Sequence, residues 1–230
     1  MDTSAYQQLA LEKLGGEFGR IDLLITALTH RSYLNEHRST VKEHNERLEF
    51  LGDAVLELVV TDFLYKNYSE PEGILTNWRS SLVRTESIGA AAQRLGFESL
   101  LRLSRGEKHG TERARAQILA NSFEAVTGAL YLDRGYEAAR QFITDNILST
   151  FDDILKTGSW MDPKSRLQEV VQSQGEATPQ YRVLTEDGPD HDKTFTVGVF
   201  VDEELKGQGT GPSKQAAQVV AATDALKRYQ

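Results

Sequence analysis

The sequence centres on residues 44–56, which read HNERLEFLGDAVL and place three carboxylates inside one of the most apolar runs of the chain. A helix over this run puts Glu46, Glu49 and Asp53 at positions i, i+3 and i+7, on one face and in adjacent turns. Stacked carboxylates beside a core repel one another and lose hydration, so we expect a compensating cation. Mg²⁺ is the economical candidate because it prefers oxygen ligands. A solvated helix face that carries these acids by chance is the alternative.

The apolar residues of the same run keep helical spacing and predict a buried face beside the acidic one. We expect this face to consist of Leu48, Leu51, Val55, Leu58 and Val59.

A second apolar helix, predicted over residues 118–131, carries Asn121 and Glu124 at i and i+3. If the two helices pack together, their oxygens can converge on one cation at the rim of a helical core. A bound cation can turn water into a nucleophile for a phosphodiester. The sequence contains no Ser-His-Asp elbow, P-loop or dinucleotide fingerprint that would favour another chemistry.

Length and composition limit the classes of protein. With 230 residues, of which 39% are hydrophobic, the chain can form one large or two smaller domains. It has no cysteine, which excludes disulfides, zinc-thiolate sites and thiol nucleophiles. We find no secretory signal and no apolar run long enough to span a bilayer, so we expect a soluble, cytoplasmic protein. A net charge of −8 argues against nucleic-acid binding by bulk electrostatics, so such contacts would need local basic clusters or bridging cations.

Periodicity predicts an all-α domain over residues 1–156, a short linker over 157–160 and a small α+β domain over 161–230. In the first domain, helical segments are expected over 6–31, broken at Gly15 and Gly16, and over 75–95, with Leu11 among the core residues. His30 is read as a capping or packed histidine near a helix end.

In the second domain, the expected order is α-β-β-β-α, with strands over 181–186, 195–202 and 204–209. Asp162 caps the first helix, Ser213 caps the last, and a tight turn at 202–203 joins two strands. Val220 is expected to pack against the sheet.

Residues 45–56 resemble the signature of bacterial ribonuclease III, and the likeness extends over nearly the whole chain. Residues 27–33, 72–79 and 118–129 resemble further motifs of that family's nuclease domain. The tail resembles its double-stranded RNA-binding domain at residues 162–165, 181, 188–191, 195 and 209–214.

The resemblance implies a homodimeric endonuclease that cleaves double-stranded RNA with Mg²⁺, or Mn²⁺ as a substitute. It implies 5′-phosphate and 3′-hydroxyl ends, short 3′ overhangs, and roles in processing ribosomal RNA precursors and messenger RNA. Matching residue by residue makes Asp53 and Glu124 catalytic, and assigns metal binding to Glu49, Asp53, Asn121 and Glu124. Glu46 and Glu72 match acidic positions near the site.

The resemblance also places the dimer contact around Phe50 and Leu51 of the same apolar run. The chain departs from the family pattern at Asn121, where the family has aspartate. An amide oxygen can still coordinate Mg²⁺ or bind its water, so we expect a weaker site. A catalytically silent double-stranded RNA-binding protein is the main alternative, and a metal-dependent hydrolase of a small substrate is a third.

The second departure is the charge of the tail. Residues 160–230 hold eight Lys and Arg against eleven Asp and Glu, a net charge of −3, and Lys214 is followed by Gln215 where the family is basic. Such domains read the shape of A-form RNA through phosphates and 2′-hydroxyls. We therefore expect weak, strongly salt-dependent RNA binding, carried by a few residues: Gln168, Glu169, His191, Ser213 and Lys214.

Overall fold

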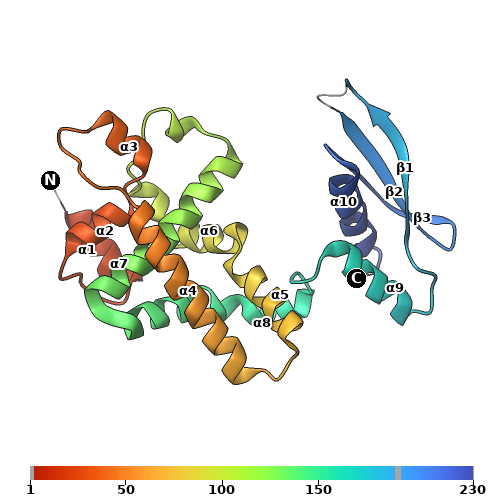
Figure 1. The fold of residues 1–230 in the computed structure, drawn as a ribbon, viewed down its shortest axis with the longest axis horizontal. Helices are drawn as coiled ribbons and strands as arrows, with labels where there is room; N and C mark the ends of the chain where they lie inside the picture. Colours follow the sequence, from red (N-terminus) through yellow and green to blue (C-terminus); the bar gives the residue numbers. More distant parts are fainter. Residues whose placement is uncertain (1–2, 190–192, 230) are drawn as a thin grey trace. The chain divides into compact units, whose positions relative to one another are not determined.

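The computed structural model describes residues 3–189 and 193–229, and the chain divides into two compact units, Met1–Ile154 and Leu155–Gln230 (Figure 1). The first is helical and the second has the order α-β-β-β-α, as the sequence predicts. The helix α8 (Phe151–Thr157) runs across the division. In the part of the chain that is described, no helix has the length and apolar character to cross a membrane.

The helices of the first unit that precede α8 follow in chain order. They are α1 (Ser4–Lys13), α2 (Ile21–Ala27), α3 (Arg31–Glu36), α4 (Glu46–Asn67), α5 (Glu72–Val83), α6 (Thr85–Arg94), η1 (Phe97–Ser99), η2 (Glu107–His109), α7 (Glu112–Asn146) and η3 (Leu148–Thr150).

The helices α4 and α7 cross at unusually close range because each has a buried glycine at the contact (Figure 1). A β-carbon added at Gly52 would overlap the backbone carbonyl of Glu124. One added at Gly128 would overlap the carbonyl of Leu48. The absence of both side chains therefore lets the two backbones touch. It also sets the first turns of α4 beside the middle of α7.

Buried apolar side chains surround this crossing. Phe123 stacks on Phe142, with ring centroids 4.9 Å apart, and so ties together the two halves of α7. These halves meet at Gly135, whose φ of 82° interrupts the helix four residues after the end of the predicted helix 118–131. The largest fully buried side chains include Leu24, Leu28, Leu56, Leu64, Phe123, Leu130 and Ile143.

The prediction of the buried face of α4 is only partly correct. Leu48, Val55 and Val59 are buried, but Leu58 is 57% exposed and Leu51 is half-buried. The helix is apolar on two sides, and Leu58 belongs to the outer side. The core position expected for Leu11 is also wrong, since its side chain is exposed on α1. Spacing alone could not tell which apolar side meets the core.

The single helix expected over residues 75–95 is two helices. Arg84 has extended backbone angles (φ −65°, ψ 152°) and separates α5 from α6. The hydroxyl of Ser87, in the first turn of α6, donates to the carbonyl of Ser81 at 2.8 Å. This bond satisfies an end carbonyl of α5 and stabilises the corner.

The second unit is a three-stranded antiparallel sheet in the order β1-β2-β3 with two helices. Its elements are α9 (Pro163–Ser173), β1 (Gln180–Asp187), β2 (Thr194–Val201), β3 (Glu204–Gly211) and α10 (Lys214–Leu226). Both predicted caps are confirmed: Asp162 accepts from the backbone N–H groups of Lys164 and Ser165, and Ser213 from that of Ala216.

The predicted turn between β2 and β3 is also confirmed. Asp202 and Glu203 have φ values of 49° and 65°, the left-handed pair that a two-residue hairpin requires. On β3, Gly207 and Gly209 lie against the backbone of α10, where a β-carbon would clash. The helix α10 packs on β2 and β3 through alanines, while Val220, expected in the core, lies on its exposed side.

We predict that Gly128→Ala destabilises the helical unit, because the new methyl group meets the backbone of α4. Overpacking of this kind costs about 3 kcal/mol, which lowers the melting temperature by about 6–12 °C for a protein of this size. Thermal unfolding followed by circular dichroism measures the change. The matched control is Gly73→Ala in the first turn of α5, where nothing lies within 4 Å. Equal melting temperatures for both variants would contradict the close contact.

Candidate active site and RNA-binding surface

Four of the predicted site residues meet beside the glycine crossing. Glu49 and Asp53 come from α4, and Asn121 and Glu124 come from α7. Asn121 makes a side-chain hydrogen bond to Glu49, and Glu124 is close enough to Asp53 and Glu49 for their charges to act on it. The tertiary structure therefore brings together the two pairs of oxygen-bearing side chains that the sequence places on separate helices.

The electrostatics of this cluster are unfavourable. Burial, followed by repulsion from Asp53 and Glu49, raises the pKa of Glu124 to about 8. Burial and repulsion from Glu46 and Asp53 also raise the pKa of Glu49, and the hydrogen bond from Asn121 opposes this shift. Negative charge is thus concentrated where little positive charge compensates it.

Oxygen donors under mutual repulsion suit a hard divalent cation such as Mg²⁺. Among the described residues, no group of three or more His, Cys, Asp or Glu side chains is placed so that it could hold a metal ion. The fit to a cation therefore rests on the chemistry of these oxygen donors.

The side chain of Asn121 is held from two directions. Its Oδ1 accepts a hydrogen bond from Nε2 of Gln117 at 2.7 Å, and its amide nitrogen donates to Glu49. One lone pair of Oδ1 is therefore engaged, and the second remains for a cation or its water. Sequence reasoning missed Gln117, although its position one helical turn before Asn121 was a signal for this contact.

Glu46 and Glu72, the two further acidic residues predicted near the site, lie in different places. Glu46 begins α4, next to the cluster, with Arg31 Nη1 at 3.6 Å and His44 Nδ1 at 3.8 Å. Glu72 is exposed in the first turn of α5 and lines a hollow of about 460 Å³ that also includes Thr61. Thr61 follows Asp53 by eight residues, about 12 Å along the helix. The hollow beside Glu72 includes none of the four side chains of the cluster.

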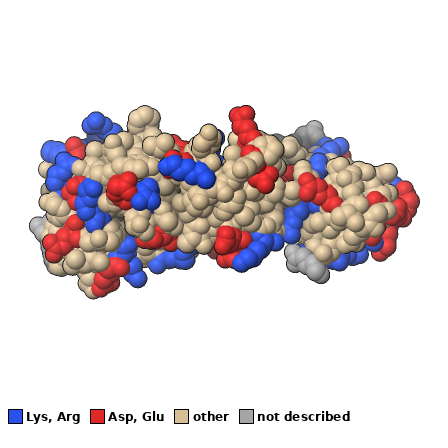
Figure 2. Space-filling view, turned by 90° about the horizontal axis from the view of Figure 1, so that it is seen from below, with Lys and Arg blue, Asp and Glu red and all other residues tan. Residues whose placement is uncertain are grey.

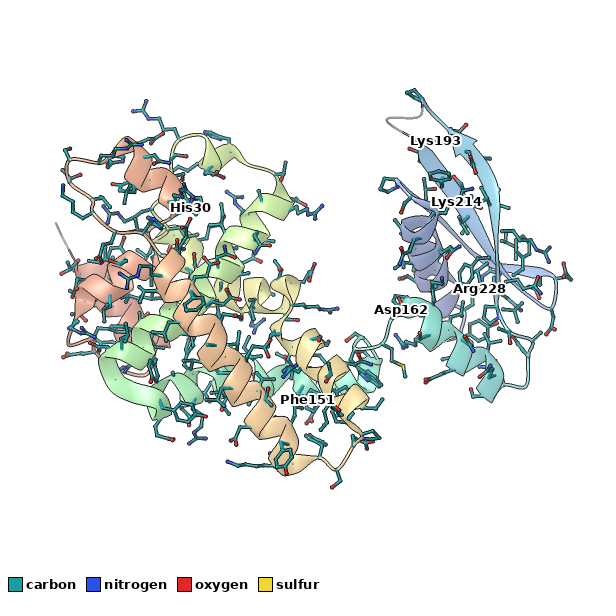
Figure 3. All side chains as sticks on the ribbon, in the orientation of Figure 1. His30, Phe151, Asp162, Lys193, Lys214 and Arg228 are labelled. Carbon is teal, nitrogen blue, oxygen red and sulfur yellow. The ribbon has the colours of Figure 1, made fainter. Side chains whose placement is uncertain are left out.

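His30 has the structural role expected from the sequence. Its Nδ1 accepts from the backbone N–H of Ser32 at 3.3 Å and so caps α3 (Figure 3). Burial lowers its pKa, which favours the neutral ring needed for an acceptor.

The predicted RNA contacts lie on two helices of the second unit. Gln168 and Glu169 are exposed on α9, and the side chain of Ser213 is occupied as the cap of α10. His191 falls outside the described residues. Lys214 is exposed at the start of α10 (Figure 3). Its Nζ lies 5.4 Å from the centre of the Phe195 ring.

Charge on this unit is mixed, as its composition requires. Lys214 Nζ is paired with Glu186 Oε1 at 2.8 Å, a partner that sequence reasoning did not identify. On the face drawn in Figure 2, basic and acidic side chains are interspersed. The cation expected to bind phosphate therefore has a carboxylate partner within its own domain.

Comparison with known proteins identifies both domains. The chain matches the Ribonuclease-III-like family model over residues 20–151 and the double-stranded RNA binding motif over residues 163–229. It is 45% identical to Ribonuclease 3 of Bdellovibrio bacteriovorus over 218 residues, covering 94% of this chain and 93% of that protein. It is also 45% identical to Ribonuclease 3 of Enterococcus faecalis over 220 residues, covering 94% of each.

A solved structure shares the fold of the first unit. The nuclease domain of ribonuclease III from Campylobacter jejuni has a TM-score of 0.54 and 33% identity, covering 63% of this chain and 95% of that one. The fold and site thus define a helical nuclease domain followed by a double-stranded RNA-binding domain. The chain belongs to the ribonuclease III family, which confirms the resemblance seen in the sequence.

We predict that, without divalent cations, Glu124→Gln stabilises the protein more at pH 9 than at pH 5. The pKa of Glu124 is raised above its ordinary value, so stability from this group is present at low pH and is lost as the pH rises toward about 8. Solvent screening reduces the effect to about 1 kcal/mol, or about 2–4 °C in melting temperature.

Differential scanning fluorimetry at the two pH values measures this change. Glu17→Gln, which removes an exposed carboxylate far from the cluster in sequence, is the control and should show no such dependence. A pH-independent effect of Glu124→Gln would count against a charge-repelled carboxylate at this position.

Proposed function

We propose that this member of the ribonuclease III family hydrolyses double-stranded RNA in a Mg²⁺-dependent reaction, with Mn²⁺ as a substitute. The products would be 5′-phosphate and 3′-hydroxyl ends with short 3′ overhangs, and the substrates ribosomal RNA precursors and messenger RNA. The observation that carries the proposal is the meeting of Glu49, Asp53 and Glu124 across the α4–α7 crossing. The double-stranded RNA binding motif in the same chain would bind the duplex substrate.

Glu49, Asp53 and Glu124 are the residues that would hold the cation, and Asn121 adds its oxygen. When bound, Mg²⁺ lowers the pKa of water and stabilises charge on the scissile phosphate. Asp53 is exposed, so its carboxylate can reach the phosphodiester and the attacking water. The water oxygen forms the new bond to phosphorus and the 3′-oxygen leaves, which gives the proposed ends.

Asn121 contributes by position as well as by its oxygen. Its amide donates to Glu49 and so favours the ionised form of that carboxylate. Gln117 in turn fixes the amide through the 2.7 Å hydrogen bond. These bonds support an active site with one charge fewer than an aspartate would give. The silent RNA-binding alternative rests on the same missing charge.

The apolar outer side of α4 supports a homodimer. Phe50 is 82% exposed, and Leu58 and Tyr65 continue the same apolar side of the helix. Phe50 adjoins a hollow of about 880 Å³ whose lining includes Leu23, Leu51 and Leu132. In a two-fold interface, the exposed ring of each chain can enter the hollow of its partner. In the related nuclease domain from Campylobacter jejuni, a region involved in dimer formation is structurally flexible.

Cleavage of a labelled RNA duplex with Mg²⁺ tests the reaction. We expect Glu124→Ala to lower the rate at least about 100-fold, because a ligand is lost, and Asn121→Asp to lower the Mg²⁺ concentration needed for half-maximal rate about 10-fold. Glu112→Ala, an exposed acid at the start of α7, is the matched control and should leave cleavage unchanged. Failure of the natural sequence to cleave, with activity restored by Asn121→Asp, would establish the silent binder.

The dimer is tested by Phe50→Asp, which places a charge in the proposed interface. We expect the variant to be monomeric in light scattering at micromolar concentration, whereas the natural chain is a dimer. Leu11→Asp, at an exposed apolar site on α1, is the control and should remain dimeric. A natural chain that is monomeric under these conditions would refute the interface.

A further inference from the structure

Lys214 begins α10, and Glu186 lies near the end of β1. Their side chains meet with Nζ and Oε1 2.8 Å apart. The other oxygen of Glu186, Oε2, lies 3.9 Å from Nζ of Lys193. Figure 3 shows both lysines at the same end of the domain. One carboxylate thus lies between two of the few cations in a domain of net charge −3.

The strand register explains this position. Glu186 pairs with Phe195 across β1 and β2, and the Phe195 ring lies 5.4 Å from Nζ of Lys214. The ring and the carboxylate therefore both lie beside the ammonium group of Lys214. Proximity to Lys214, then to Lys193, lowers the pKa of Glu186, so it stays ionised at neutral pH.

We propose that Glu186 limits the affinity of this domain for RNA by competing with phosphate for Lys214. The inference rests on the binding of double-stranded RNA, not on cleavage. An exposed ion pair is weak and can open. When Lys214 turns to a phosphate, Glu186 loses its partner and lies close to the negative backbone of the RNA. Binding therefore gains less from this lysine than from one without a carboxylate neighbour.

The same competition has a consequence for salt dependence. A lysine that contacts a phosphate releases a condensed counterion. Each such contact makes the slope of log K against log salt concentration steeper by about 0.7–0.9. In this domain the released Glu186 carboxylate takes up a cation, which offsets part of that release. Removing Glu186 should therefore raise affinity at low salt and make binding more salt-sensitive.

The test measures binding of the full chain to an RNA duplex by fluorescence anisotropy, without divalent cations and at several salt concentrations. We expect Glu186→Gln to raise affinity about 3–10-fold at low salt. We also expect it to make the slope of log K against log salt concentration steeper by up to about 0.9. Glu204→Gln is the matched control, since it removes the same charge from an exposed pair with Lys206, 2.9 Å apart on β3. The control should change affinity much less.

A double-mutant cycle isolates the pair. In a Lys214→Gln background, Glu186→Gln should raise affinity no more than Glu204→Gln does. Equal gains from the two single variants would show that net charge alone acts, and a loss of affinity in Glu186→Gln would show that Glu186 orients Lys214 for RNA. Either result overturns the inference. No duplex binding by any variant at low salt would instead count against the RNA-binding function itself.

Discussion

The backbone contact between α4 and α7 is the constraint on which the nuclease domain depends. Gly52 faces the carbonyl of Glu124, and Gly128 faces that of Leu48, so neither position has room for a β-carbon. The two residues lie within about one turn of the acidic side chains of their own helices. The same absence of side chains that allows the helices to touch therefore places the carboxylates opposite each other, and the fold and the site have one physical cause.

The acidic cluster is the part of the domain that folding alone does not favour. Burial raises the pKa of Glu124 to about 8, and the neighbouring carboxylates add to the shift. Asn121 relieves part of this repulsion, because an amide adds no charge and donates to Glu49. Where a further carboxylate would add charge, the chain thus has a hydrogen-bonded network that continues to Gln117. Under the proposed function, this site would need less compensation from a cation than an all-carboxylate site.

The RNA-binding domain also has a shortage of positive charge. Glu186 pairs with Lys214, one of eight basic residues between 160 and 230, and Lys193 lies near the same carboxylate. A dimer would bring two such tails to one duplex, which raises effective affinity without a new contact.

The sequence by itself determined the helical and α-β-β-β-α units, the caps at Asp162 and Ser213, and the hairpin turn at 202–203, because these follow from local spacing and turn chemistry. It also indicated the acidic residues of both helices. Only the tertiary structure decided which apolar side of α4 is buried, since Leu58 and Val59 are equally apolar and differ only in what faces them. Likewise, the hydrogen bond of Asn121 with Glu49 and the ion pair of Glu186 with Lys214 join residues far apart in the chain. Local periodicity carries no information on such contacts, because they depend on how the elements pack.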